Sequence, residues 1–243
     1  AASADGNVIV ERSIAGPASM LGNPVDIVLS GTDLRVAEKS NDAILVFSNI
    51  FAGPSGDIAP TLVTASIKPE SLVEVHNNSQ QADISDIASA NISLLGVAVS
   101  SNPSSETATT GEIARLSSAL NGQISTFNNS VSIESVAFDL AGDSYTTFDD
   151  TASSTGGVII GNRVASSRDG GMYTDSRDRM IMGSNTGLIS PKGIDVASAK
   201  GLIFVAENNA TSPAIQVFSS CANGNVSPLI TLTPANSARP WDV

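Results

Sequence analysis

The chain has few of the residue types on which most enzyme active sites depend. It contains one cysteine and one histidine, Cys221 and His76, in 243 residues. A single cysteine excludes an intrachain disulfide, and a zinc or copper site normally needs several Cys or His ligands. A serine or cysteine nucleophile needs a nearby base, and His76 is far from Cys221 in sequence. These shortages argue against transition-metal and triad chemistry.

Several familiar motifs are absent, and positive charge is scarce. The sequence has no Gly-x-Ser-x-Gly segment, no glycine-rich phosphate loop and no EF-hand loop. There are 12 Lys and Arg against 24 Asp and Glu, so the formal net charge is −12, and the most basic stretch, 163–179, also carries three aspartates. Binding to a nucleic-acid duplex needs clustered Lys and Arg. We therefore expect no nucleic-acid partner.

Long apolar runs are missing as well. No stretch of about 18 apolar residues occurs, so we expect no transmembrane segment. The first residues, Ala1-Ala2-Ser3-Ala4, resemble what remains after a signal peptide is cleaved at a small-residue site. A remnant of recombinant expression is the alternative. The first interpretation predicts an exported protein that is periplasmic, on the cell surface or secreted.

Apolar residues are nevertheless plentiful, in short segments. Hydrophobic residues make up 41% of the chain and aromatic residues only 4%, so the core must be built from Val, Ile, Leu and Ala. The segments are bounded by Gly, Pro, Asn or Asp, which is strand composition with turn residues between strands. No long window has helical periodicity. The pattern predicts an all-β protein.

Four apolar segments recur in the same order in two distant stretches. The segments are PVDIVL, LRVAE, AILVF and GDIAPTL within 24–62, and PKGIDV, IFVAE, AIQVF and GNVSPLI within 191–230. Weaker first segments begin near Pro69 and Ile133, another begins at Pro240, and Gly6–Val10 matches the fourth segment. Internal repetition at this spacing is the mark of a repeat architecture.

Four strands in about 40 to 50 residues is the period of a β-propeller blade. A lone blade exposes two apolar faces and open edges, and stacking blades around an axis buries the faces. We predict one propeller domain over 1–243, with about four recognisable antiparallel blades and partial blades at both ends. The polar segments 100–111, 149–157 and 166–171 are predicted to be loop insertions.

The predicted strand order leaves the last blade incomplete. The repeat starts on a fourth strand and stops on a first strand, so a blade joining the two ends would lack its middle strands. We therefore expect residues 1–243 to be part of a longer chain with six or seven blades in total.

The best-matched unit resembles a known repeat. Its pattern is Pro-x-Gly-Ile-Asp-Val, then Gly-Leu-Ile-Phe-Val-Ala-Glu-Asn, then Ile-x-Val-Phe, then Gly-Asn-Val-x-Pro, and it is similar to NHL-like and lactonase-like propeller repeats. The match is close over 191–243, good over 23–64 and loose between 69 and 185. The resemblance implies a propeller but no single activity, because such folds include lactonases, lyases, oxidoreductases and binding scaffolds.

In such a propeller, the loops after the second and fourth strands of each blade share one face around the axis. We expect that face to carry the candidate ligand or metal residues Glu38, Asn41, Asp149, Asp150, Glu207, Asn208 and Arg239, with Asn23 and Asn236 beside them. Glu38 and Glu207 occupy equivalent repeat positions. One interpretation is a ring of oxygen ligands able to hold Ca²⁺. The alternative is that each carboxylate caps its own loop by accepting backbone N–H bonds.

Two functions fit these observations. The first is an exported, non-catalytic scaffold that binds a protein, a glycan or a cell-envelope component through its loop face. It is favoured by the missing catalytic residue types and the acidic, Ser/Thr/Asn-rich composition. The second is a lactonase-like hydrolase in which a divalent ion near the axis activates water. It is favoured by the resemblance and by the paired glutamates.

Overall fold

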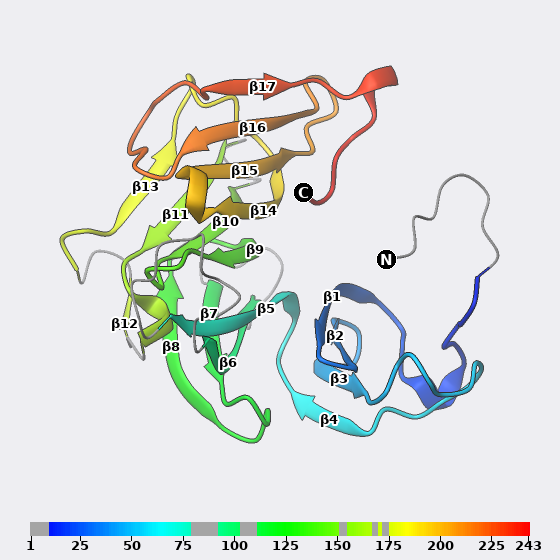
Figure 1. Ribbon diagram of the computed structural model, residues 1–243. Helices are drawn as coiled ribbons and strands as arrows, with labels where there is room; N and C mark the ends of the chain where they lie inside the picture. The colour runs from blue at the N-terminus through cyan, green and yellow to red at the C-terminus, as the bar shows by residue number, and fades with distance from the viewer. Residues whose placement is uncertain (1–9, 79–91, 103–110, 151–154, 167–169, 172–174) are drawn as a thin grey trace.

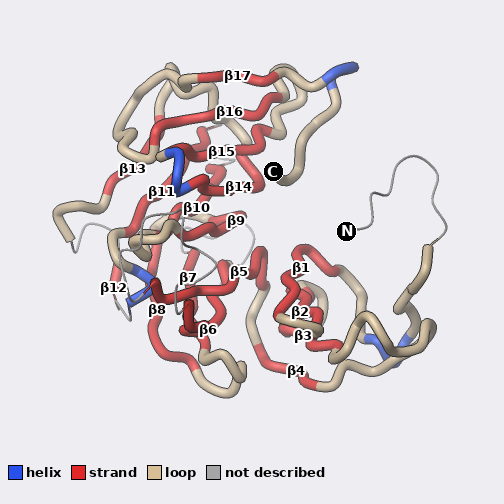
Figure 2. Tube along the Cα trace, viewed as in Figure 1, coloured by secondary structure: helices blue, strands red, loops and turns tan. Residues whose placement is uncertain are grey.

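The computed structural model describes residues 10–78, 92–102, 111–150, 155–166, 170–171 and 175–243. These residues form four β-sheets and a few short 3₁₀ turns, with no α-helix among them. Figures 1 and 2 show the sheets arranged around a common axis. We name them blades I to IV in chain order. The prediction of an all-β propeller is confirmed.

Each blade runs from an inner strand to an outer strand. Blade I contains β1 (Pro24–Ser30), β2 (Asp33–Glu38), β3 (Ala43–Phe47) and β4 (Leu62–Ala65). Blade II contains β5 (Pro69–Asn78), β6 (Ile92–Ser101), β7 (Gly111–Leu116) and β8 (Gln123–Asn129), with β12 (Gly170–Gly171) added in parallel at its outer edge.

The other two blades follow the same plan. Blade III contains β9 (Ile133–Phe138), β10 (Ser144–Asp150), β11 (Thr155–Gly161) and β13 (Arg179–Met182). Blade IV contains β14 (Pro191–Ala197), β15 (Leu202–Glu207), β16 (Ala214–Ser219) and β17 (Ile230–Leu232). The 3₁₀ turns are η1 (Pro17–Ser19), η3 (Val164–Ser166), η4 (Ser198–Lys200) and η5 (Ala235–Ser237).

The inner strands β1, β5, β9 and β14 begin at the four repeat starts that the sequence predicts: Pro24, Pro69, Ile133 and Pro191. Consecutive inner strands contact one another, so the second and third residues of each strand meet at one end of the axis. The strand order inside each blade is sequential and antiparallel, apart from β12. The repeat in the sequence is therefore the blade in the structure.

Three apolar layers between blades form most of the core. Side chains alternate between the two faces of a strand, so each blade can bury one face against each neighbour. The layer between blades I and II contains fully buried Ala37, Ile44, Val97 and Val99. The layer between blades II and III contains Ile113, Phe127, Phe148 and Ile159. The layer between blades III and IV contains Val158, Ile160, Ile181, Ile203 and Val205. As composition predicts, Val and Ile fill most of these positions.

The outer faces of blades I and IV are only partly covered. On blade I, residues 14–21 pack over buried Val36 and Leu45, while Ile27 and Leu29 are exposed. On blade IV, Ile230 and Leu232 lie on the face away from blade III and are about half exposed. In Figure 1 the described strands form an arc that is open between these two faces.

Some predicted boundaries are wrong. Asp149 and Asp150 end β10, and Thr155 to Gly157 begin β11, because they pair as a hairpin rather than forming a loop insertion. Ser100 and Ser101 likewise end β6, and Gly111 begins β7. Within 166–171, Ser166 ends η3 and Gly170–Gly171 form β12. Residues 103–110, 151–154 and 167–169 of these segments lie outside the described residues.

The predicted first strand at Pro240–Val243 is also wrong as a strand. The segment is irregular, and the described structure gives it one backbone bond to β14, from Gly193 N–H to Trp241 O at 2.9 Å. One bond is too few to make a ladder. Of the predicted fourth segment Gly6–Val10, all but Val10 lies outside the described residues, and Val10 is not in a strand.

Candidate functional site

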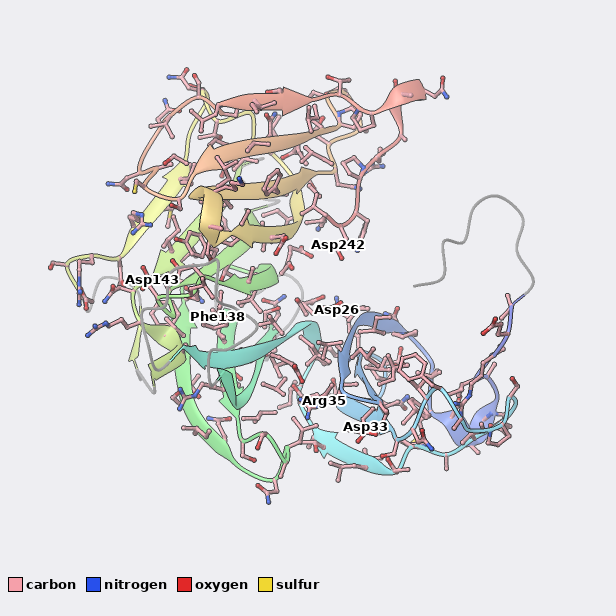
Figure 3. The ribbon with its side chains drawn as sticks, viewed as in Figure 1. Asp26, Asp33, Arg35, Phe138, Asp143 and Asp242 are labelled. Carbon is pink, nitrogen blue, oxygen red and sulfur yellow. The ribbon has the colours of Figure 1, made fainter. Side chains whose placement is uncertain are left out.

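A cleft of about 630 Å³ lies at the end of the axis where the inner strands begin. Its wall includes the second residue of every inner strand, Val25, Glu70, Glu134 and Lys192. Residues 241–243 of the C-terminal segment complete the lining. We call it the axial cleft. Figure 3 shows Asp26 and Asp242, two of its lining residues, on opposite sides of the open part of the arc.

One backbone bond, repeated in three blades, forms the rim of the axial cleft. The residue after the second strand donates its N–H to the residue before the first strand: Lys39 to Asn23 at 3.1 Å, Asn102 to Lys68 at 3.3 Å and Asn208 to Ser190 at 3.0 Å. This bond brings the two loops of a blade together at one end of the axis. The predicted loop face is therefore present.

Blades I and II are joined across the rim by an ion pair. The Lys39 ammonium lies 2.8 Å from the Glu70 carboxylate, and both side chains are largely buried. The Asn102 amide also donates to Glu70 at 3.1 Å. Because a buried charge needs a partner, this pair fixes both side chains in the wall of the axial cleft.

A second ion-pair group joins blades III and IV. The Lys192 ammonium lies 2.7 Å from Glu134 and 2.9 Å from Asp149. Burial raises the pKa of Glu134 to about 7 even though Lys192 opposes that change. Burial works to lower the pKa of Lys192, but Glu134 and Asp149 outweigh it and the net pKa is raised. The group is thus a fixed ammonium between two carboxylates.

The open side of the cleft carries an aromatic ring and further carboxylates. Trp241 is 63% exposed, and the Lys192 ammonium lies 5.6 Å from its ring centroid, within cation–π range. Asp195 and Asp242 are exposed. Asp26 accepts bonds from the Ser71 hydroxyl and the Leu72 N–H, both at 2.8 Å. Burial raises the pKa of Asp26, and the charge of Asp242 adds to that rise.

The two repeated glutamates lie behind the rim, and neither is part of the cleft lining. Glu38 accepts backbone N–H bonds from Gly22, Asn23 and Ser40, at 2.8 to 3.0 Å. Glu207 accepts the corresponding backbone N–H bonds from Ile189, Ser190 and Asn209, at 2.8 to 2.9 Å. Both side chains are fully buried, and burial raises the pKa of Glu207. Each carboxylate caps the loop that precedes its own inner strand.

The other predicted site residues are dispersed. Asp149 lines the axial cleft, and Asp150 ends β10 beside it. The Asn41 amide donates to Met20 O at 2.7 Å, outside the lining. Asn208 donates to Pro240 O at 2.9 Å and Arg239 donates back to Asn208 O at 2.8 Å, which holds the C-terminal segment near the rim.

Sequence reasoning missed most of the cleft lining. The charged or aromatic lining residues it did not single out are Asp26, Lys39, Glu70, Glu134, Lys192, Asp195, Trp241 and Asp242. A signal for them was available, because Glu70, Glu134, Lys192 and Trp241 all stand one residue after a repeat start. The residue type at that position differs from blade to blade, so a search for similar residues among the repeat units does not reveal it.

Within the described residues, no three His, Cys, Asp or Glu side chains come close enough together to hold a metal ion. In the same part of the chain, no helix has the length and apolar character needed to cross a membrane.

Comparison with known proteins supports the fold alone. No family model and no curated protein matches the chain. Among solved structures, it is similar to a candidate 6-phosphogluconolactonase from Bacteroides uniformis, with a TM-score of 0.50, 14% identity and 88% of this chain covered. It is also aligned with the WD40 domain of Toxoplasma gondii coronin, with a TM-score of 0.41, 10% identity and 87% covered. The chain spans 56% and 59% of these two proteins.

Proposed function

We propose that the protein is an exported, non-catalytic β-propeller module that binds a polar ligand in its axial cleft. The observation that carries the proposal is the state of the charged groups there. Lys39, Lys192, Glu70, Glu134 and Asp149 are all engaged in ion pairs across blade boundaries. Groups held in this way define a rigid polar surface and suit recognition.

The lining combines features that recognise polar molecules. Carboxylates, Asn23 and the exposed Trp241 ring line one space. An exposed aromatic ring beside hydrogen-bonding groups is typical of ligand sites. Export suits a partner such as a cell-envelope protein or glycan.

A hydrolase is the second candidate, because Glu134 has a pKa of about 7 in the cleft. A carboxyl group with such a pKa can act as a general base near neutral pH. The likeness to a candidate 6-phosphogluconolactonase is consistent with this alternative, but at 14% identity it supports only the fold. Among the described residues, no group of three or more His, Cys, Asp or Glu side chains is placed to hold the divalent ion that the sequence hypothesis requires.

The two candidates are separated by assaying turnover. We expect no hydrolysis of δ-gluconolactone or 6-phosphogluconolactone above the buffer rate, with or without added Ca²⁺ or Zn²⁺. Hydrolysis that is lost in Glu134→Gln and kept in Glu11→Gln would replace the binding proposal with the enzyme. Glu11 is an exposed glutamate outside the cleft, so it controls for the same loss of charge.

A further inference from the structure

We infer that the axial cleft binds an organic cation, namely a ligand that carries an alkylammonium or guanidinium group. This inference rests on the proposed binding function and names the ligand class. Six carboxylates line the cleft, and its cations are two lysines, so its formal charge is −4. The carboxylates are Asp26, Glu70, Glu134, Asp149, Asp195 and Asp242. A low-dielectric cleft whose net charge has one sign attracts ions of the opposite sign.

The wall of the cleft already binds an ammonium group, which is the protein's own. The Lys192 Nζ atom lies 2.7 Å from Glu134, 2.9 Å from Asp149 and 5.6 Å from the ring centroid of Trp241. Carboxylates with an aromatic face are the partners that proteins use for ammonium and guanidinium groups. The Lys192 ammonium therefore shows which chemistry this wall accepts.

Two carboxylates beside that wall have no ammonium partner among the described residues. Asp195 and Asp242 are exposed, and the side-chain bond of Asp242 is to the N–H of the next residue, Val243, at 2.9 Å. Asp242 also lies close enough to Asp26, on the other side of the cleft, to repel its charge (Figure 3). A cation bound between Asp26 and Asp242 relieves the repulsion between their two charges.

The geometry favours an organic cation over a metal ion. A hard cation such as Ca²⁺ takes six to eight oxygen ligands, and no group of three clustered acidic or other metal-binding side chains occurs among the described residues. Trp241 adds a large exposed ring, which a metal ion does not use. The same charge argument disfavours anionic ligands, including phosphorylated sugars, because both lysines are already paired with carboxylates.

Trp241 is the only tryptophan in the chain, so its fluorescence reports directly on the cleft. The test is a fluorescence titration at low ionic strength with spermidine, a hexapeptide containing Lys and Arg, N,N′-diacetylchitobiose and 6-phosphogluconate. We expect saturable changes with the first two probes and none with the last two. If only spermidine binds, the natural ligand is a free amine. If only the peptide binds, the natural ligand is a Lys or Arg side chain of a protein.

Variants assign the binding to the carboxylates. Asp242→Asn should weaken binding of the cationic probe about tenfold, Asp195→Asn should do the same, and Glu11→Gln should leave it unchanged. Raising the salt concentration to about 0.15 M should weaken binding of the cationic probe to the wild-type protein.

Three results would overturn the cation inference. They are no response to either cationic probe at millimolar concentration, binding that Asp195→Asn and Asp242→Asn leave intact, and saturable binding of the neutral disaccharide in place of the cations. In the third case the binding proposal stands and only the ligand class changes. Turnover in the lactone assay would instead remove the binding proposal itself.

Discussion

At the scale of single residues, Thr146 and Thr147 are neighbours with opposite roles. The Thr146 hydroxyl is buried between blades II and III and has no hydrogen-bond partner among the described residues. The Thr147 hydroxyl accepts from Ser135 N–H at 3.1 Å and donates to Lys192 O, so it connects β9 to β14. A buried polar group without a partner is destabilising, whereas one with partners is stabilising.

These roles predict opposite effects of one substitution. Thr146→Val should raise the free energy of unfolding by about 1 kcal/mol, because a methyl group replaces an unsatisfied hydroxyl. Thr147→Val should lower it by about 1 to 3 kcal/mol, because Ser135 N–H and Lys192 O lose their partner. Urea denaturation of both variants measures the difference. Equal effects of the two substitutions would contradict this account.

Glu134 predicts a pH dependence of stability. Its pKa is about 7 in the folded protein against 4.5 for a free side chain, so between these values the folded state binds more protons than the unfolded state. Its contribution to stability is therefore fully present below pH 4.5 and is lost as the pH rises towards about 7. The difference in unfolding free energy between wild type and Glu134→Gln should fall across that interval.

Urea denaturation at several pH values measures this difference, with Glu11→Gln as the control. Glu11→Gln removes an exposed carboxyl group outside the cleft, so it controls for the loss of one charge. A constant difference between wild type and Glu134→Gln would show that the Glu134 carboxyl group does not take up a proton on folding.

At the scale of elements, Asn102 joins two blades through both ends of its amide. Its Nδ2 donates to Ile133 O at 2.8 Å and its Oδ1 accepts from Ile133 N–H at 2.9 Å, in a buried setting. Asn208 makes the first of these bonds, to Pro240 O, at the equivalent place in blade IV. Each asparagine thus binds the segment that follows its own blade: Asn102 binds Ile133 at the start of β9, and Asn208 binds Pro240.

Asn102→Ala should therefore destabilise the protein by about 2 to 3 kcal/mol, because it leaves two buried backbone groups of Ile133 unpaired. Asn121→Ala, at an exposed turn position, should change the free energy of unfolding by less than about 0.5 kcal/mol. Thermal or urea unfolding measures both. An Asn102 variant as stable as the Asn121 variant would show that β9 does not need this connection.

The sequence predicted the elements better than it predicted the site. Strands were recognisable because Val, Ile and Phe recur between turn residues, and the starts at Pro24, Pro69, Ile133 and Pro191 are confirmed. The hairpin at Asp149–Gly156 was missed, since Asp and Gly are disfavoured in strands and only the ladder with the neighbouring strand holds them there. The cleft was missed because pairs such as Lys192 with Glu134 join residues 58 positions apart.

At the scale of the whole molecule, net charge and exposed apolar surface have opposite effects on association between molecules. The net charge of −12 opposes association between molecules. The outer faces of blades I and IV favour it, because they expose apolar side chains of the kind that the inner layers bury. In the inner layers, by contrast, apolar side chains such as those of Val158 and Ile203 are fully buried.

The exposed end faces predict binding of a hydrophobic dye to the 243-residue chain. The double variant Ile230→Thr, Leu232→Thr should reduce the fluorescence of bound anilinonaphthalene sulfonate, as should Ile27→Thr, Leu29→Thr on blade I. Each double variant should change the free energy of unfolding by only about 1 kcal/mol or less, because these side chains are already about half exposed. Leu140→Thr is the control, since Leu140 is 50% exposed in a turn away from both faces. If the Leu140 variant lowers the dye signal as much as the double variants do, the end faces are not the apolar surface that the dye detects.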